Sequence, residues 1–154
     1  MRPFIERLLW DSRGTSTIEL AIMLPIGLAL MLGAVDASMA FAQKLRVETA
    51  AARTIEQITA YSRVQTDYSA SVAEAAAAAN VPVSDVTATL WLECNNVRQA
   101  NYTADCPNSS DQIARFVNIG IRGKFKPSIN YGQFLKTDAG GYLPIYGEAS
   151  VRIQ

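Results

Sequence analysis

Histidine is absent from this chain of 154 residues. The commonest general base and the commonest metal ligand are therefore missing, which weakens any interpretation as a metal centre or an acid–base catalyst. Charge is also scarce, since only 18% of the residues are charged and the 14 basic side chains balance the 14 acidic ones. This balance gives no argument for a nucleic-acid partner.

Cysteine is nearly absent, with Cys94 and Cys106 as the two examples. Their spacing does not form a CxxC motif and histidine is missing, so a redox-active thiol pair is the weaker interpretation. On the periplasmic or extracellular side of a membrane these residues can form a disulfide. Closing a loop of this size stabilises a fold by roughly 3 kcal/mol in the chain-entropy model, a large contribution for a domain with little core.

Glycine and proline are absent from residues 34–81, so this stretch contains none of the strongest helix breakers. Apolar side chains there recur at helical spacing on one face. We therefore expect one long helix from about residue 17 to about residue 61. Its first half would lie in a membrane, and its second half would pack on a soluble domain through Val47, Ala51, Ile55 and Ile58.

No charged residue occurs in residues 20–35, which follow Glu19 and precede Asp36. At 1.5 Å per residue, a helix over residues 20–43 is long enough to cross a hydrocarbon core of roughly 30 Å. Basic residues before this segment favour a cytoplasmic N-terminus, whereas those that follow weaken the bias. The preceding ones are Arg2, Arg7 and Arg13, and the following ones are Lys44 and Arg46.

Three interpretations of this segment are open. It can be an uncleaved signal anchor, or a secretory signal peptide cut near Ser38, Ala40 and Ala42, the small residues of 38–42. It can also be a prepilin-type segment cut on the cytoplasmic side after Gly14, five residues before Glu19. The third interpretation alone explains the glycine, the acid and the long apolar helix together.

Glu19 has a physical role in the third interpretation. Cleavage after Gly14 would create an α-amino group on Thr15, about one helical turn before the carboxylate. Pairing of these charges, within one subunit or between neighbours, lowers the cost of an acid near lipid and fixes the register between packed helices. The alternative is that Glu19 lies in the headgroup zone and reaches water. Asp36 has two corresponding interpretations: a hydrated acid at the outer interface, which we favour, or a contact with a partner helix.

The sequence RGTSTIELAIMLP of residues 13–25 resembles the start of TadE-like proteins. These proteins show an Arg-Gly step, a few small residues, a Val/Ile-Glu-Phe/Leu-Ala step and then Leu-Pro inside an apolar run. The step GAVD at 33–36 and the alanine-rich helix at 43–60 are also similar, and residues 147–152 look like the closing strand of the family. The resemblance is strong over about residues 13–60 and looser beyond.

The resemblance implies a minor pilin, or pseudopilin, of the tight adherence (Flp) pilus system. It implies cleavage by a prepilin peptidase between Gly14 and Thr15, and a role for Glu19 in assembly. Its partners would be the peptidase, other pilin and minor pilin subunits, the inner-membrane assembly platform and membrane lipid. The chain would be a single-pass protein of the bacterial inner membrane with a periplasmic C-terminal domain, and a subunit of the extracellular pilus after assembly. Thr15 departs from the large apolar residue of the wider type IV class, although small residues occur in the TadE-like group.

Beyond the long helix, an alanine-rich helix is expected at 68–79, with Asn80 at its end. The apolar period then changes to two over residues 86–93, 117–125 and 149–153, which predicts three strands. The fold class is therefore α+β: a long N-terminal helix, a second helix and a roughly three-stranded antiparallel sheet, in a pilin-like arrangement. The predicted domains are a leader at 1–14, a transmembrane helix at 15–43 and a periplasmic head at 44–154.

Other charged groups of the head give weaker signals. Arg122, Lys124 and Lys126 lie on one face of a predicted strand, as a patch for an anionic partner or, in the interpretation we favour, as a solvated face that discourages edge pairing. Scattered acids such as Glu93, Asp105 and Glu148 are not positioned as a pair by any motif.

The sequence contains no nucleophile–base pair, phosphate loop or metal cluster, so we expect neither an enzyme nor a cofactor. A signal-anchored or secreted periplasmic binding domain unrelated to pili remains the alternative function.

Overall fold

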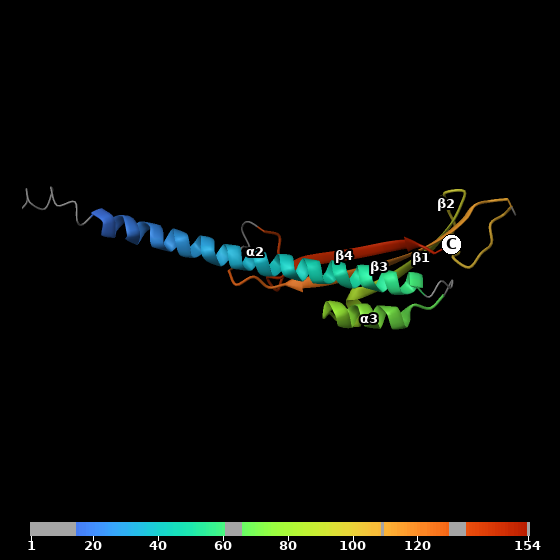
Figure 1. The fold of residues 1–154 in the computed structure, drawn as a ribbon, viewed down its shortest axis with the longest axis horizontal. Helices are drawn as coiled ribbons and strands as arrows, with labels where there is room; N and C mark the ends of the chain where they lie inside the picture. Colours follow the sequence, from blue (N-terminus) through green and yellow to red (C-terminus); the bar gives the residue numbers. More distant parts are fainter. Residues whose placement is uncertain (1–14, 61–65, 109, 130–134, 154) are drawn as a thin grey trace, which may run out of the picture. The chain divides into compact units, whose positions relative to one another are not determined.

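The computed structural model describes residues 15–60, 66–108, 110–129 and 135–153 (Figure 1). The helices are α2 (Thr15–Ala60), α3 (Ser69–Ala79) and the short 3-10 helix η1 (Val83–Asp85). The strands are β1 (Val86–Cys94), β2 (Val97–Arg98), β3 (Ile113–Phe125) and β4 (Leu143–Arg152). The chain divides into two compact units, Met1–Ser38 and Met39–Gln154, and the second is called the head below.

The long helix predicted from the lack of glycine and proline is confirmed, because α2 is continuous over 46 residues. Pro25 lies inside it, in the apolar half, where one missing backbone hydrogen bond is tolerated. In the second half, threonine hydroxyls donate to the carbonyls one turn earlier, which satisfies these polar groups on the helix itself. These bonds join Thr49 to Leu45, Thr54 to Ala50 and Thr59 to Ile55, at 2.8–2.9 Å.

The second helix is also confirmed. Before α3, the Asp67 carboxylate accepts a hydrogen bond from the backbone N–H of Ser69 at 2.9 Å, and this bond lowers the pKa of Asp67. At the other end Asn80 adopts a left-handed conformation with φ 56°, as expected of a helix stop. The N–H of Val81 then donates to the carbonyl of Ala76 at 3.0 Å, which closes the last turn.

The three predicted strands form an antiparallel sheet, and a fourth strand was missed. The order is β2-β1-β3-β4. β2 contains two residues and pairs with the end of β1 through a tight turn at Asn95 and Asn96, both with positive φ. Asparagine tolerates this conformation, so the Asn-Asn step was the available signal.

One face of the sheet packs against α3 and the part of α2 that belongs to the head. Along each strand the residues that face these helices are mostly apolar and buried, and the alternate residues are more exposed. The largest fully buried side chains are Leu92, Ile119, Ile121, Val47 and Val117. The face of α2 predicted to pack on the head is confirmed, since Val47, Ala50, Ala51, Ile55 and Ile58 all lie in the core cluster.

Two glycines let α2 approach the sheet closely. Gly123 of β3 and Gly147 of β4 flank the side chain of Val47, which is fully buried. A Cβ atom at Gly147 would lie 2.7 Å from a methyl of Val47 and 2.9 Å from its backbone carbonyl carbon. Helix and strand backbones therefore meet at Gly147 with no room for a side chain.

Candidate functional site

The apolar part of α2 is exposed on all its faces within its own unit. Every described side chain of residues 16–32 is exposed, although most are leucine, isoleucine, methionine or alanine. A helix that is apolar all round requires a nonaqueous environment or partner helices. By length and composition, α2 is able to cross a membrane, as an anchor or as a signal sequence.

Glu19 is an exposed acid in the second turn of this helix. The next charged residue, Asp36, is 17 positions away, or roughly 25 Å along the axis. Thr15 begins α2, so it lies four residues before Glu19 on neighbouring turns of the same face. An α-amino group at Thr15 would therefore meet this carboxylate within the helix. Gly14 and the rest of the predicted leader lie outside the described residues.

Asp36 does not match the hydrated interpretation that the sequence favoured. It is buried, with 3% of its surface exposed, among neighbours in α2 that are mostly exposed. That interpretation was wrong because it placed the acid by counting residues along the helix, and counting does not show which residues are covered.

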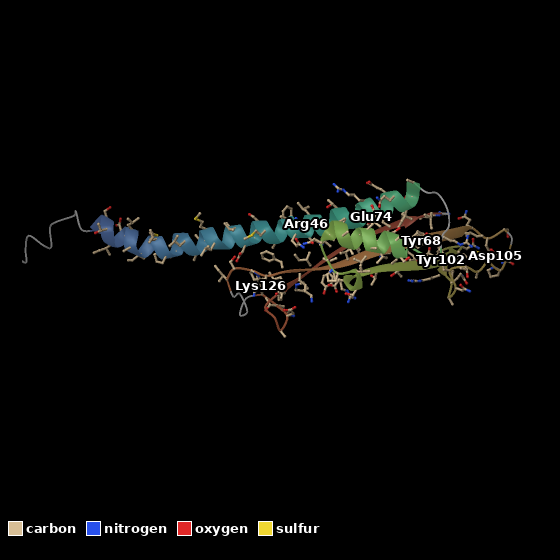
Figure 2. All side chains as sticks on the ribbon, turned by 90° about the horizontal axis from the view of Figure 1, so that it is seen from below. Arg46, Tyr68, Glu74, Tyr102, Asp105 and Lys126 are labelled. Carbon is tan, nitrogen blue, oxygen red and sulfur yellow. A yellow bond between two sulfur atoms is a disulfide. The ribbon has the colours of Figure 1, made fainter. Side chains whose placement is uncertain are left out.

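The predicted disulfide is confirmed. Cys94 at the end of β1 is bonded to Cys106, with the two Cα atoms 5.7 Å apart. Arg115 of β3 adds a second attachment for the enclosed loop, because its guanidinium donates to the carbonyl oxygens of Tyr102 and Ala104. Burial raises the pKa of Tyr102 to about 12, and the neighbouring hydroxyl of Tyr68 adds to the rise. The loop is thus fixed at one end of the head, where Figure 2 labels Tyr68, Tyr102 and Asp105.

The scattered acids are not brought together. Glu93 lies opposite Ala114 and Glu148 lies opposite Gly120, so six positions of β3, roughly 20 Å, separate them along the sheet. Glu93 accepts a hydrogen bond from the indole N–H of Trp91 at 2.9 Å, which makes it a structural acceptor. No cluster of three potential metal ligands occurs within the part of the chain that the structure describes.

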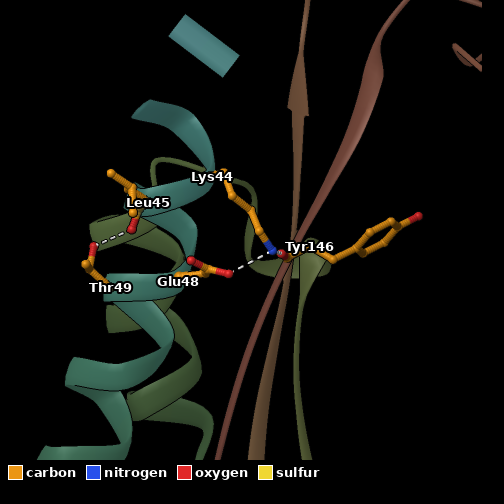
Figure 3. Close-up of polar contacts among 5 residues, drawn as sticks. All are labelled: Lys44, Leu45, Glu48, Thr49 and Tyr146. Carbon is orange, nitrogen blue, oxygen red and sulfur yellow. Dashed lines mark hydrogen bonds and ion pairs between the residues drawn. The ribbon is translucent and has the colours of Figure 1, made fainter. Parts of the chain in front are cut away.

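A contact that sequence reasoning missed joins α2 to β4. The ammonium group of Lys44 is 2.9 Å from the carboxylate of Glu48 and also donates to the backbone carbonyl of Tyr146 (Figure 3). An open groove of about 540 Å³ runs beside this contact, with Arg122 and Glu148 among its lining residues. Its mixed charges and its exposure offer no enclosed site for a small molecule.

The N-terminal part of the chain is similar to a known protein family. The model of the TadE-like protein family matches residues 14–55. No curated protein and no solved structure matches the chain. The match begins at Gly14, contains Glu19 and the apolar half of α2, and continues through Ile55 in the core of the head. Over residues 14–55 this chain is therefore similar to the TadE-like protein family.

Proposed function

We propose that this chain is a minor pilin of a tight adherence pilus, cleaved by a prepilin peptidase after Gly14. The observation that carries the proposal is the exposed apolar helix with one acid, Glu19, four residues after the position where cleavage would create a positive charge. The family match over residues 14–55 covers both the cut site and the acid. TadE-like pilins are generally structural proteins without enzymatic activity.

Assembly in this proposal proceeds through packing of α2 against α2 of neighbouring pilin subunits. In the inner membrane the apolar half of α2 is covered by lipid, and in the pilus it is covered by other helices. In the pilus, an ion pair between the Thr15 amino group of one subunit and Glu19 of its neighbour, in place of the pair within one helix, selects the axial register, because a register that leaves either charge unpaired in an apolar environment costs several kcal/mol. The head, held to α2 by Val47 and its neighbours, then forms the periplasmic and finally the extracellular surface.

Substitution of Gly14 tests the cleavage. We expect a Gly14→Leu chain to keep its leader, because a large side chain at the scissile bond obstructs the peptidase. On electrophoresis it will migrate more slowly than the processed wild type, by the 14 residues of the leader. Gly27→Leu is the matched control, since a Cβ at Gly27 meets no atom within 4 Å and cleavage should be normal. Equal mobility of the Gly14→Leu chain and the wild type would overturn the cleavage at this position.

A further inference from the structure

Exposed aromatic and basic side chains gather at one end of the head. We call this set the basal surface; it consists of the exposed residues Phe41, Lys124, Lys126, Tyr142 and Tyr146 and the half-buried Leu143. The start of β4 lies against α2 here, because Phe41 and residues 143–146 line one shallow groove of about 490 Å³. Lys124 pairs with Pro144 across the sheet, and Lys126 lies beyond the end of β3. Figure 2 shows Lys126 at the opposite end of the head from Tyr102 and Asp105.

The aromatic members of this surface are large and exposed to solvent. Phe41 is 64% exposed and Tyr146 is 59% exposed, the latter although it lies between the buried residues Ile145 and Gly147. Aromatic side chains with one apolar body and one polar end are the residues that proteins place in the headgroup layer of a membrane.

The charged members are free to bind an anion. Neither Lys124 nor Lys126 has a carboxylate at ion-pair distance among the residues that the structure describes. Lys126 lies over the ring of Tyr142, 5.8 Å from its centre, so the ring holds the ammonium group without neutralising it. The Asp138 carboxylate also lies here, because it accepts a hydrogen bond from the backbone N–H of Tyr142 at 2.9 Å. Two lysines and one carboxylate leave a positive balance beside the exposed aromatic rings.

The basal surface is also close along the chain to the apolar segment. Phe41 and Lys44 follow Asp36 by five and eight residues of continuous helix, which is about 8 and 12 Å of rise. A headgroup layer is roughly 5–8 Å deep on each side of the hydrocarbon core. The head therefore begins along the chain within about two helical turns of the charge-free segment 20–35.

From these observations we propose that the basal surface binds the headgroup layer of an anionic phospholipid membrane. Lys124 and Lys126 contact the phosphates, and Tyr142, Tyr146 and Phe41 insert among the headgroups. The proposal rests on the membrane insertion of α2 that belongs to the proposed function. Before assembly, this contact would hold the head against the membrane, and extraction of the subunit into a pilus would have to break it.

Tryptophan reporters in nanodiscs test the contact. The full chain carries Trp10→Phe and Trp91→Phe, so that an introduced indole is the only one, and the nanodiscs contain phosphatidylglycerol brominated near the headgroup. With Tyr146→Trp we expect strong quenching of fluorescence. With Ser150→Trp, an exposed position four residues further along the same face of β4, we expect almost none. A third reporter, Leu28→Trp, with deeply brominated lipid, reports insertion of α2.

Charge variants then test the lysines. Lys124→Gln with Lys126→Gln should weaken binding of the head to the membrane by about fivefold for each cation removed, as expected for basic residues at an anionic surface. Arg53→Gln with Arg98→Gln removes two exposed cations elsewhere and should have no effect. The same loss in both pairs would overturn a specific lysine contact.

The reporters separate the two proposals. Quenching at position 28 without quenching at position 146 would show that α2 is inserted but that the basal surface does not contact the headgroups. The headgroup contact alone would then be overturned, and a protein subunit would be the remaining candidate partner of this surface. No quenching at position 28 would show that α2 is not inserted, and both proposals would then fail.

Discussion

A Glu19→Ala chain will be processed normally and will be almost absent from assembled pili. The substitution leaves Gly14 and the apolar helix intact, so the peptidase still meets its site. In the pilus, however, the new ammonium group of Thr15 is left without its carboxylate. Removing one partner of a buried ion pair costs about 3–5 kcal/mol, so we expect incorporation to fall by about a hundredfold or more. Immunoblots of sheared pili and of membranes measure the ratio.

Glu56→Ala is the matched control for this experiment. It removes one exposed acid from the same helix, but in the head, and its incorporation should equal that of the wild type. Normal incorporation of the Glu19→Ala chain would contradict the register role, and loss of cleavage would show that Glu19 acts at the peptidase step.

Gly147→Val will destabilise the head strongly. Its Cβ alone would lie 2.7 Å from a methyl of Val47 and 3.0 Å from the backbone nitrogen of Glu48. The valine methyls would add to this overlap, and a helix backbone cannot rotate away as a side chain does. Overpacking typically costs about 1–3 kcal/mol, and we expect the upper end of that range. Denaturant unfolding of the purified chain in detergent measures the loss.

Ser150→Val separates overpacking from strand propensity. Ser150 is an exposed residue of the same strand, so the same new side chain meets solvent there. A free energy of unfolding that is equal for the two variants would contradict the close approach of α2 at Gly147.

Local signals in the sequence were sufficient for the main elements of the fold. The lack of glycine and proline in residues 34–81 predicted α2, because helix continuity depends on neighbouring residues. The alternation around Leu92 and Ile119 predicted β1 and β3, because side chains of a strand alternate between faces. The disulfide followed from the presence of two cysteines only.

Features that depend on contacts between distant segments were not predictable in the same way. Gly147 has an ordinary strand conformation, and its constraint comes from Val47, 100 positions earlier. Burial of Asp36 has no local signal either. The basal surface brings Phe41 of α2 together with residues of β3 and β4. These residues lie far apart in the sequence, so no single sequence pattern contains them all. The lysine pattern at 122–126 was visible, but its aromatic neighbours were not.

At the candidate site, too, some features could be predicted from the local sequence and others required the structure. The spacing of Gly14 and Glu19 is local and was visible in the sequence, as was the apolar length that follows. What the structure adds is that Thr15 and Glu19 belong to one uninterrupted helix with exposed apolar faces. That continuity lets a charge created by cleavage lie one turn from the acid.

The N-terminal residue of the chain purified from cells distinguishes the three interpretations of residues 1–43. Edman degradation or mass spectrometry of the intact protein identifies it. A minor pilin cut after Gly14 begins at Thr15, and this is the result we predict. Met1 would indicate an uncleaved anchor, and Phe41 or Gln43 would indicate a secreted domain. Either of these results would contradict the proposed function.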